Sequence, residues 1–431
     1  MKLAIIGGAG VRVPLLVNGL VQSDLPITDI ALFDIDADRL RVIAGLASRF
    51  AGSARVHVSS ELGEAIEGAD FVFISIRVGG IRGRARDEAI ALEHGLIGQE
   101  TVGPGGFAMA VRTIPAMVGY ASEIARRAPN AWIINFTNPV GIIMQAVRQA
   151  TGARIIGICD TPTELFEDVA HALEVPSIEC YFDYFGLNHL GWLREVYHRG
   201  TPQLARLWDR PDLLGQVYRA SLFEVERLQA LRLLPTEYVY YYYRAEHALR
   251  NITRAGESRG MVIDRLNTQL FDDLRDSRRD PVATYHQYLA ARNAGYMQLE
   301  SGANAPVARS PWAELTGYDK IALQTVRGIH FNLGTMVPLN VANRGNLPDL
   351  EADDVIEVPC LVNANGALAL HVGPVPDRVR ELLVHVKEYE RRTVKAGLTQ
   401  TREDAVEALA CNPLVTSRAQ AADLVAALAP A

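Results

Sequence analysis

The chain has 431 residues and a formal net charge of −7 at pH 7; 49% of its residues are hydrophobic and 22% are charged. These values are typical of a soluble globular protein, exclude a disordered or fibrous chain, and give no reason to expect nucleic acid as a partner. Because one hydrophobic core stops growing at roughly 250 to 300 residues, we expect two domains.

Neither a secretory signal nor a membrane span is predicted. The first apolar run, residues 3–6, is followed at once by glycines, and no uninterrupted apolar run reaches the roughly 18 residues of a membrane helix. The four cysteines form no CxxC pair, which fits reduced thiols, and we interpret Cys180, Cys360 and Cys411 as core or surface thiols. We therefore expect a cytoplasmic protein with no membrane partner.

Strands and helices alternate over the first 165 residues. Buried strands are predicted at residues 2–6, 30–33, 70–76, 132–136 and 154–158, with helical stretches between most of them. This alternation predicts an α/β fold with a doubly wound, Rossmann-like parallel sheet, which binds ligands at the carboxyl ends of its strands.

The second half of the chain is less regular and predicts a mixed α+β structure. Helical runs are expected at residues 211–233 and 281–299, a polar and mobile-looking stretch at 247–260, and strands at 335–341 and 355–362.

Gly8 and Gly10 lie between the first predicted strand and the following helix. At such a turn the backbone can approach a pyrophosphate, which rests on amide groups at the positive end of the helix. Val13 replaces the third glycine of the usual GxGxxG pattern, so an ordinary tight turn is the alternative. Asp34, at the end of the second strand, would hold a ribose hydroxyl and repel a 2′-phosphate, which predicts NAD rather than NADP. Arg77, after the third strand, is a further expected cofactor contact.

Cys159 and His189 are the candidate metal ligands. Cys159 follows the fifth predicted strand at the ligand-binding edge of the sheet, and His189 lies with Asn188 in a short polar break between apolar residues. One thiolate and one imidazole, with positions left for substrate oxygens, suit Mn²⁺, Co²⁺, Ni²⁺ or Fe²⁺. The alternative is that both side chains are core residues, the more common place of a single cysteine.

Arginines and glycines follow the third predicted strand. Arg77 and Arg84 belong to a run of four arginines within ten positions. Guanidinium groups bind phosphate or carboxylate oxygens through paired hydrogen bonds, so we predict an anionic substrate group here. For Arg82 and Arg86, a solvated helix start paired with the two following acidic residues is an equal alternative. Residues 95–107 contain five glycines, and we expect them to wrap a ligand rather than form a regular element.

Five tyrosines occupy the six positions 238–243. Most must be structural, because adjacent side chains on a regular element point in different directions. One tyrosine beside a metal and an arginine would have a pKa low enough for it to act as a base. The pattern alone does not indicate which one.

Together these motifs resemble glycoside hydrolase family 4, the NAD- and metal-dependent glycosidases, and most closely its 6-phospho-β-glucosidase branch. The resemblance is loose at residues 5–8 and much closer at 95–107, 135–139, 157–159, 186–190, 235–243 and 358–360. It therefore covers most of the chain. It implies hydrolysis without the usual pair of catalytic carboxylates, because this family departs from that scheme.

The resemblance also implies a mechanism. NAD⁺ takes a hydride from C3 of the sugar, and the metal on Cys159 and His189 polarises the oxygens at C2 and C3. A tyrosinate removes the acidified C2 proton, the C1 substituent leaves, water adds and the hydride returns. By position in the motif, Tyr238 is the first candidate for the base and Tyr241 the second.

Substrate contacts follow from the same resemblance. Arg84 and Asn138 would contact the phosphorylated sugar of a disaccharide or glucoside, and Arg259 would be a further phosphate ligand. Asp160 departs from the β-specific branch, which usually has Asn after the metal-binding cysteine; Asp is typical of α-specific members, where it can protonate the leaving group. Both anomers therefore stay open, as do the unphosphorylated substrates of α-galactosidase-type members.

We predict an NAD-binding Rossmann-like domain at residues 1–165, a substrate, metal and oligomerisation domain at 166–431, and, by family analogy, a homodimer or homotetramer. Two other functions compete. An NAD-dependent hydroxy-acid dehydrogenase accounts for Asp34 and the arginines but leaves Cys159 and His189 unexplained. A non-catalytic NAD-sensing protein would need no metal.

Overall fold

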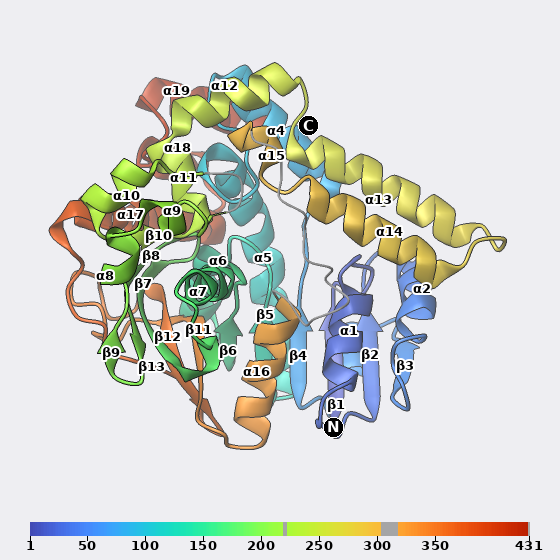
Figure 1. Cartoon of the computed structure of the whole chain (residues 1–431). Helices are drawn as coiled ribbons and strands as arrows, with labels where there is room; N and C mark the ends of the chain where they lie inside the picture. Colours follow the sequence, from blue (N-terminus) through green and yellow to red (C-terminus); the bar gives the residue numbers. More distant parts are fainter. Residues whose placement is uncertain (219–221, 303–317, 430–431) are drawn as a thin grey trace.

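A computed structural model describes residues 1–218, 222–302 and 318–429. Within these ranges a nine-stranded sheet runs in the order β13-β12-β11-β6-β5-β4-β1-β2-β3 (Figure 1). Its parallel strands are β1 (Lys2–Ile6), β2 (Asp29–Phe33), β3 (Arg55–Val58), β4 (Phe71–Ile74), β5 (Trp132–Asn135) and β6 (Ile155–Gly157). Three antiparallel strands extend it beyond β6: β11 (Thr335–Ala342), β12 (Val355–Asn363) and β13 (Gly366–Ala369).

The strand order confirms the predicted doubly wound fold. From β1 the chain moves outward through β2 to β3, returns to β4 on the other side of β1, and continues to β5 and β6. All five predicted strands of this region are present. β1 is apolar from Leu3 to Ile6 because it lies inside the sheet, paired with β2 on one edge and β4 on the other, and helices cover both faces of the sheet. The sequence analysis missed β3, a four-residue edge strand with partly exposed side chains.

Helices cover both faces of this sheet. α1 (Val13–Val21) packs beside α16 (Tyr318–His330) at the front of Figure 1, while α5 (Gly103–Arg127), α6 (Val140–Ala150) and α17 (Asp377–Thr399) pack against one another on the opposite face. Right-handed crossovers place the helices of the two halves on opposite faces in this way. The others around the sheet are α2 (Ala37–Ala47), α3 (Leu62–Ile66), α4 (Gly80–Glu93), α7 (Thr161–Ala172), α18 (Arg402–Ala410) and α19 (Arg418–Leu428).

A second, antiparallel sheet lies beside the first, and the sequence analysis did not predict it. In the described residues β7 (Cys180–Leu187) and β8 (Leu190–His198) form a hairpin, with β10 (Leu234–Pro235) and β9 (Thr201–Pro202) also paired to β8. Tyr184, Phe185 and Trp192 of the hairpin are fully buried. β7 packs against β12, so the two sheets share one hydrophobic core.

The remaining helices correct two predictions. The run predicted at 281–299 is divided into α14 (Pro281–Ala294) and α15 (Gln298–Ser301). The run predicted at 211–233 contains α9 (Pro211–Leu214) and α10 (Val225–Leu231), with part of it outside the described residues. The prediction of a mobile stretch at 247–260 is wrong. α12 (Ala245–Ala255) and the start of α13 (Arg259–Arg275) occupy these residues. Its polar residues form the outer side of α12, while Ala248 and Ile252 are buried.

Short elements complete the second half: a 3-10 helix at Ser177–Glu179, α8 (Ala205–Trp208), and the 3-10 helix Glu237–Val239, which continues into α11 (Tyr240–Tyr243). α13 and α14 pair into an arm above the carboxyl ends of β1 and β2 (Figure 1). Strands β11 to β13, from the predicted second domain, complete the large sheet through β6, and the domain boundary at 165/166 stays a prediction.

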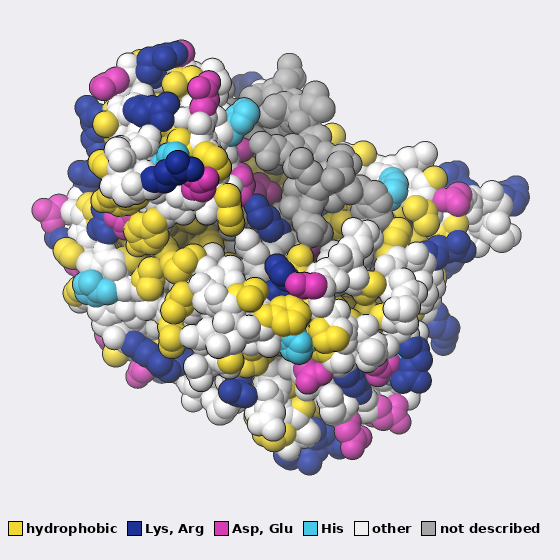
Figure 2. All heavy atoms as spheres, turned by 60° about the horizontal axis from the view of Figure 1, so that its bottom comes forward, with side chains coloured by type: hydrophobic (Ala, Val, Ile, Leu, Met, Phe, Trp, Pro, Cys, Tyr) yellow, Lys and Arg dark blue, Asp and Glu magenta, His cyan; other side chains and the backbone are white. Residues whose placement is uncertain are grey.

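Charges of both signs are intermingled on the face shown in Figure 2. Among the described residues, no helix combines the length and the apolarity needed to cross a bilayer.

Candidate active site

The chain following β1 is a close-packed glycine loop. Gly7 has a positive φ of 87°, and a Cβ there would lie 2.1 Å from the Ser75 carbonyl oxygen. A Cβ on Gly8 would lie 2.9 to 3.1 Å from atoms of Leu40, Leu32 and Phe33. The loop therefore needs glycine at Gly7 and Gly8 to pack against β2 and β4, whereas the sequence analysis assigned a role to Gly8 and Gly10.

Asp34 lies beside this loop, as the NAD prediction requires. Its Oδ2 accepts a hydrogen bond from the Ala9 amide at 3.0 Å, and its Oδ1 accepts one from the Asp36 amide at 3.0 Å. The structure thus places a partly exposed carboxylate next to the glycines of the loop. Gly10 closes the turn by donating from its amide to the Gly7 carbonyl at 2.9 Å. Cofactor binding by these residues stays a prediction.

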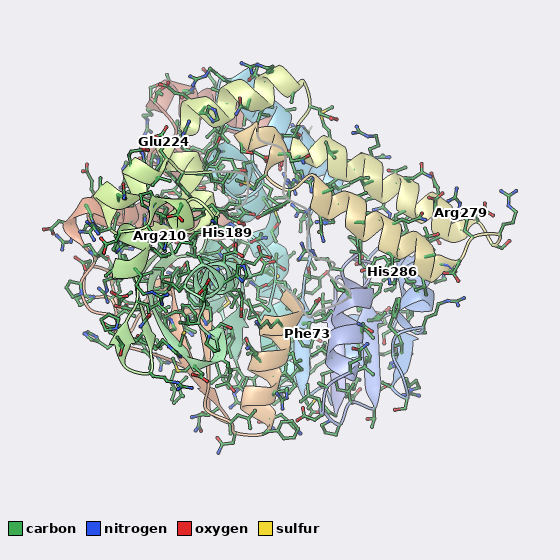
Figure 3. The ribbon with its side chains drawn as sticks, in the orientation of Figure 1. Phe73, His189, Arg210, Glu224, Arg279 and His286 are labelled. Carbon is green, nitrogen blue, oxygen red and sulfur yellow. The ribbon has the colours of Figure 1, made fainter. Side chains whose placement is uncertain are left out.

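His189 lies at the turn of the β7–β8 hairpin, near the middle of the molecule (Figure 3). The turn consists of Asn188 and His189, and His189 has a positive φ of 63°, a left-handed conformation that is uncommon for residues other than glycine. The side chain is 5% exposed, and burial lowers the pKa of His189 to about 4. The imidazole is therefore neutral at pH 7, the form that binds a metal.

Thr101 determines which nitrogen of His189 is available. Gln99 Oε1 accepts hydrogen bonds from the amides of Thr101 and Val102, at 2.6 and 2.8 Å, and from the Thr101 hydroxyl at 3.0 Å. Since the hydroxyl proton is directed to Gln99, Thr101 Oγ1 accepts the proton of His189 Nδ1, 2.9 Å away. The lone pair therefore lies on Nε2. This arrangement is typical of metal-binding histidines.

Cys159 follows β6 and is 1% exposed. Burial raises the pKa of the Cys159 thiol well above its usual range, and the charges of Glu357 and Asp160 add to the effect. The thiol therefore needs a cation to ionise, which a coordinated metal provides. Among the described residues no group of three or more His, Cys, Asp or Glu side chains could hold a metal, so a site here would draw further ligands from substrate or water. A neutral imidazole and a buried thiol fit the predicted metals.

Tyr238 connects the two predicted ligands. Its ring stacks on that of His189 with centroids 3.8 Å apart and an interplanar angle of 4°, and it is close enough to Cys159 for the two charges to interact. Burial raises the pKa of Tyr238 well above its usual value, and Glu237 and Glu100 add to this. The pKa of Tyr238 is thus not lowered, as a base would require, in the protein alone. To act as a base, Tyr238 needs an additional positive charge nearby.

Tyr241, the second candidate base, is less well placed. Its hydroxyl donates to the Met297 sulfur at 3.4 Å, and its ring centroid lies 6.0 Å from that of Tyr238. The other tyrosines of the cluster pack in the core or at its margin, as expected.

Glu100 holds two of the predicted arginines. Its Oε2 accepts from Arg77 at 2.6 Å and from Arg84 at 2.7 Å. Burial alone would raise the pKa of Glu100, but the two guanidinium groups lower it well below its usual range. Arg84 also donates to Glu88 Oε1 at 2.7 Å, and its charge interacts with Tyr238. Glu100 therefore links the arginines to the tyrosine, and sequence reasoning did not identify it.

Arg259, at the start of α13, lies close to Arg84 and Arg292. Its Nη2 donates to the Arg292 carbonyl at 2.5 Å, and the pKa of Arg259 is lowered by burial and by the charge of Arg292. Within the described part of the chain, neither Arg259 nor Arg292 has a carboxylate within ion-pair distance. Two neighbouring guanidinium groups that have no carboxylate in direct contact fit an anionic ligand. Arg292, on α14, was not predicted.

The other arginines of the run have structural partners or are exposed. Arg86 donates to the carbonyls of Ala427 and Ala429, at the end of α19, and Arg82 is exposed. The two acidic residues expected to pair with them have other partners: Asp87 binds Arg112, and Glu88 binds Arg84. The basic-helix alternative for Arg82 and Arg86 is thus right about the helix, α4, and wrong about the pairing.

Residues 95–107 differ from expectation in their second part. Helix α5 begins at Gly103, so the segment is irregular only up to residue 102. Gly105 and Gly106 pack where a Cβ would lie 2.1 Å from the Gln99 carbonyl oxygen and 2.3 Å from that of Thr101. The glycines allow the loop to fold back onto the helix start.

Asn138 and Asp160 lie at the starts of two helices. The Oδ1 atom of Asn138 is buried without a hydrogen-bond partner among the described residues, which leaves it for a ligand. Asp160 precedes α7, and its carboxylate is 4.0 Å from Arg12.

Comparisons with known proteins identify the family of the chain. The model of the family 4 glycosyl hydrolases matches residues 2–175, and that of their C-terminal domain matches residues 184–415. A probable 6-phospho-beta-glucosidase of Bacillus subtilis (strain 168) is 29% identical, over 97% of this chain and 93% of the relative.

Two solved structures are similar over nearly the whole chain. The 6-phospho-beta glucosidase of Thermotoga maritima, with NAD and glucose-6-phosphate, has a TM-score of 0.84 and 28% identity, covering 99% of this chain and 97% of that one. A 6-phospho-alpha-glucosidase from gut microorganisms, in complex with NAD and Mn²⁺, has a TM-score of 0.82 and 25% identity with the same coverage. Because both family models match and together span most of its length, the chain is an enzyme of glycosyl hydrolase family 4.

Proposed function

We propose that this enzyme hydrolyses 6-phospho-glucosides, in first place β-glucosides, with NAD and a divalent metal, Mn²⁺ or alternatively Co²⁺, Ni²⁺ or Fe²⁺. The observation that carries the proposal is the stack of Tyr238 on the neutral His189, next to the Glu100–Arg84 pair. A hydroxy-acid dehydrogenase would leave Cys159 and His189 unexplained. The Thermotoga maritima relative with NAD and glucose-6-phosphate supports the cofactor and the phosphate.

When bound, NAD⁺ supplies a hydride acceptor for C3, and the metal supplies a Lewis acid for the oxygens at C2 and C3. Gly8, Gly10, Asp34 and Arg77 would bind the cofactor, and Cys159 Sγ and His189 Nε2 would hold the metal. In the chemistry that follows, Tyr238 removes the C2 proton. A metal cation beside the phenol would oppose the effect of Glu100 and Glu237 on its pKa.

The sugar phosphate would be bound by Arg84, Arg259 and Arg292, with Asn138 on the sugar. Arg84 is held in place by Glu88 and Glu100, so its orientation is fixed before the substrate arrives. The charge of Arg84 is balanced by its ion pairs. Arg259 and Arg292 would therefore provide the positive charge that attracts the phosphate.

Asp160 favours a second candidate, the 6-phospho-α-glucosides. It directly follows Cys159, at the place where α-specific members have their acid, and its carboxylate lies at the start of α7 near Arg12. The β assignment is supported by the overall similarity to 6-phospho-beta-glucosidases. The assay must therefore decide which of the two anomers the enzyme hydrolyses.

The test uses the wild-type enzyme with NAD⁺, Mn²⁺ and a reductant, the four p-nitrophenyl 6-phospho-glucosides and galactosides, α and β, and the unphosphorylated p-nitrophenyl glucosides. We expect release of p-nitrophenol from the β-glucoside, no release from the unphosphorylated glucosides, and solvent deuterium at C2 of the product. Hydrolysis after complete removal of the bound NAD, or a product without deuterium at C2, would exclude the oxidation and elimination route.

Tyr238→Phe and Tyr241→Phe separate the two candidate bases. Tyr238→Phe should abolish C2 proton exchange, and Tyr241→Phe should leave it measurable. By the same family resemblance we propose that the enzyme is cytoplasmic and forms a homodimer or homotetramer. Sedimentation of the purified enzyme would test the oligomeric state.

A further inference from the structure

Glu357 is a buried carboxylate to which the proposed chemistry gives no role. It lies on β12 and is 1% exposed. Three residues stand side by side across the sheet: Gly157 on β6 pairs with Asn340 on β11, and Asn340 pairs with Glu357. Cys159 follows Gly157 by two positions, so Glu357 stands two strands away from the strand end that carries the thiol.

Glu357 is attached to the large sheet by Asn340. The Asn340 amide donates to Glu357 Oε1 at 2.8 Å, and the Asn340 side chain packs against Gly157, where a Cβ would lie 2.9 Å from the Asn340 Cβ. The position of the carboxylate is therefore coupled to that of β6.

On its other side Glu357 holds the β7–β8 hairpin. The Tyr184 hydroxyl, on β7, donates to Glu357 Oε2 at 2.7 Å, and the Asn188 amide, in the turn, lies 3.5 Å from Oε1. Both donors are buried, so the two contacts are shielded from water; the bond from Tyr184 is short, and the one from Asn188 is at the outer limit of hydrogen-bond length. Asn188 is the residue before His189.

Asn188 extends this connection to a third segment. Its Oδ1 accepts a hydrogen bond from the Val140 amide at 3.1 Å, at the start of α6 and directly after Asn138 and Pro139. Glu357 thus joins β6, the His189 turn and the Asn138 segment through Asn340, Tyr184 and Asn188.

We propose that Glu357 is a positioning residue that fixes the His189 turn relative to Cys159 and thereby sets the affinity for the divalent metal. The inference rests on the proposed metal site. Glu357 itself contacts neither predicted ligand through a hydrogen bond; it acts through Asn340 on one side and through Tyr184 and Asn188 on the other. Residues that orient metal ligands in this way typically affect metal affinity about 10- to 100-fold.

The test measures Mn²⁺ and NAD⁺ binding to the purified full chain by calorimetry, and Co²⁺ binding through the thiolate-to-metal absorption band. Glu357→Leu removes the acceptors and should weaken Mn²⁺ binding about 10- to 100-fold, change the Co²⁺ spectrum, and leave NAD⁺ affinity within about twofold. Glu357→Gln keeps one acceptor and a similar shape, and should restore most of the metal affinity.

Asp354→Leu is the matched control. Asp354 is equally buried, lies just before β12, and binds Arg391 rather than the hairpin. The Asp354→Leu variant should be less stable than the wild type but show no selective loss of metal binding. If Glu357→Leu does not fold, Tyr184→Phe removes one of the contacts to the hairpin and should cause a smaller loss in the same direction.

The outcomes are distinct. Unchanged Mn²⁺ affinity in Glu357→Leu, or in Tyr184→Phe if the first variant does not fold, overturns the positioning role. An equal loss of Mn²⁺ and NAD⁺ binding would also overturn it, because that indicates a general structural role. Failure of the wild-type chain to bind Mn²⁺ or Co²⁺ instead removes the metal site of the proposed function.

Discussion

Thr101 and His189 are 88 positions apart in the chain, yet Thr101 Oγ1 lies 2.9 Å from His189 Nδ1 and leaves Nε2 as the nitrogen with the lone pair. Thr101 precedes α5, and His189 lies in a hairpin turn beside the second sheet. The tautomer of His189 is therefore set by a contact between the segment before α5 and the hairpin turn. No local sequence motif contains both residues.

Thr101→Val tests this relationship. Valine has nearly the shape of threonine but accepts no hydrogen bond, so Nδ1–H would lose its partner and either tautomer would become accessible. We expect Mn²⁺ affinity to fall about 10-fold or more, with NAD⁺ affinity unchanged, in calorimetric titrations. Thr101→Ser keeps the hydroxyl and should bind Mn²⁺ nearly as well as the wild type. Equal affinities in the valine and serine variants would contradict the assigned role.

Arg292 is expected to bind the phosphate of the substrate. Removing one charge-assisted hydrogen bond costs about 1.5 to 3 kcal/mol, so Arg292→Met should raise KM for the phosphorylated substrate and weaken glucose-6-phosphate binding about 10- to 100-fold. NAD⁺ affinity should not change. Arg86→Met is the control, because Arg86 contacts the end of α19. A similar KM for the Arg292→Met and wild-type enzymes would remove Arg292 from the phosphate site.

Asp319 should make stability depend on pH. Its side chain is buried with one oxygen unpaired among the described residues, and burial raises the pKa of Asp319 to about 7, with Arg12 opposing and Asp160 adding to the shift. Between the unfolded value of 3.8 and about 7, the folded state holds a proton that the unfolded state has lost. Stability from this group is therefore lost as the pH rises through that window.

Asp319→Asn removes this effect. The free energy of unfolding of the variant, relative to wild type, should rise by up to about 4 kcal/mol between pH 4 and pH 8, measured by urea unfolding. Asp38→Asn replaces a side chain that is 80% exposed and should show no such trend. A difference that stays constant with pH would show that Asp319 is not a buried acid in solution.

The sequence predicted those parts of the fold and site that depend on local patterns. The apolar runs gave the parallel strands, and the positions directly after them gave Asp34, Asn138 and Cys159, because strand ends meet at one edge of the sheet. The hairpin β7–β8 was missed because both its strands lack a strict polar alternation; much of the hairpin is buried on both faces.

Other site residues depend on contacts between distant segments. Arg292 lies on α14, 33 positions from Arg259, and nothing in its neighbours distinguishes it from an exposed helical arginine. Glu100 had a usable signal: it is the acidic residue within the glycine-rich segment 95–107, close to four arginines in sequence. The polar composition of residues 247–260 predicts a mobile segment, but the spacing of Ala248 and Ile252 is that of one face of a helix. The helical spacing is the better guide here.

Gly105 connects the packing of α5 to the metal site. A Cβ there would lie 2.1 Å from the Gln99 carbonyl oxygen, and Gln99 in turn holds Thr101 through its side chain. Gly105→Ala should therefore displace the Gln99 backbone, lower the free energy of unfolding by about 1 to 3 kcal/mol, and weaken Mn²⁺ binding as Thr101→Val does.

Gly119→Ala provides the control within the same helix. A Cβ on Gly119 would meet no atom within 4 Å, so alanine there should stabilise the protein by about 0.5 to 1 kcal/mol and leave Mn²⁺ affinity unchanged. Thermal unfolding and Mn²⁺ titration of both variants distinguish the two positions. If Gly105→Ala bound Mn²⁺ like the wild type despite its lower stability, Gln99 would not transmit the packing of α5 to Thr101 and His189.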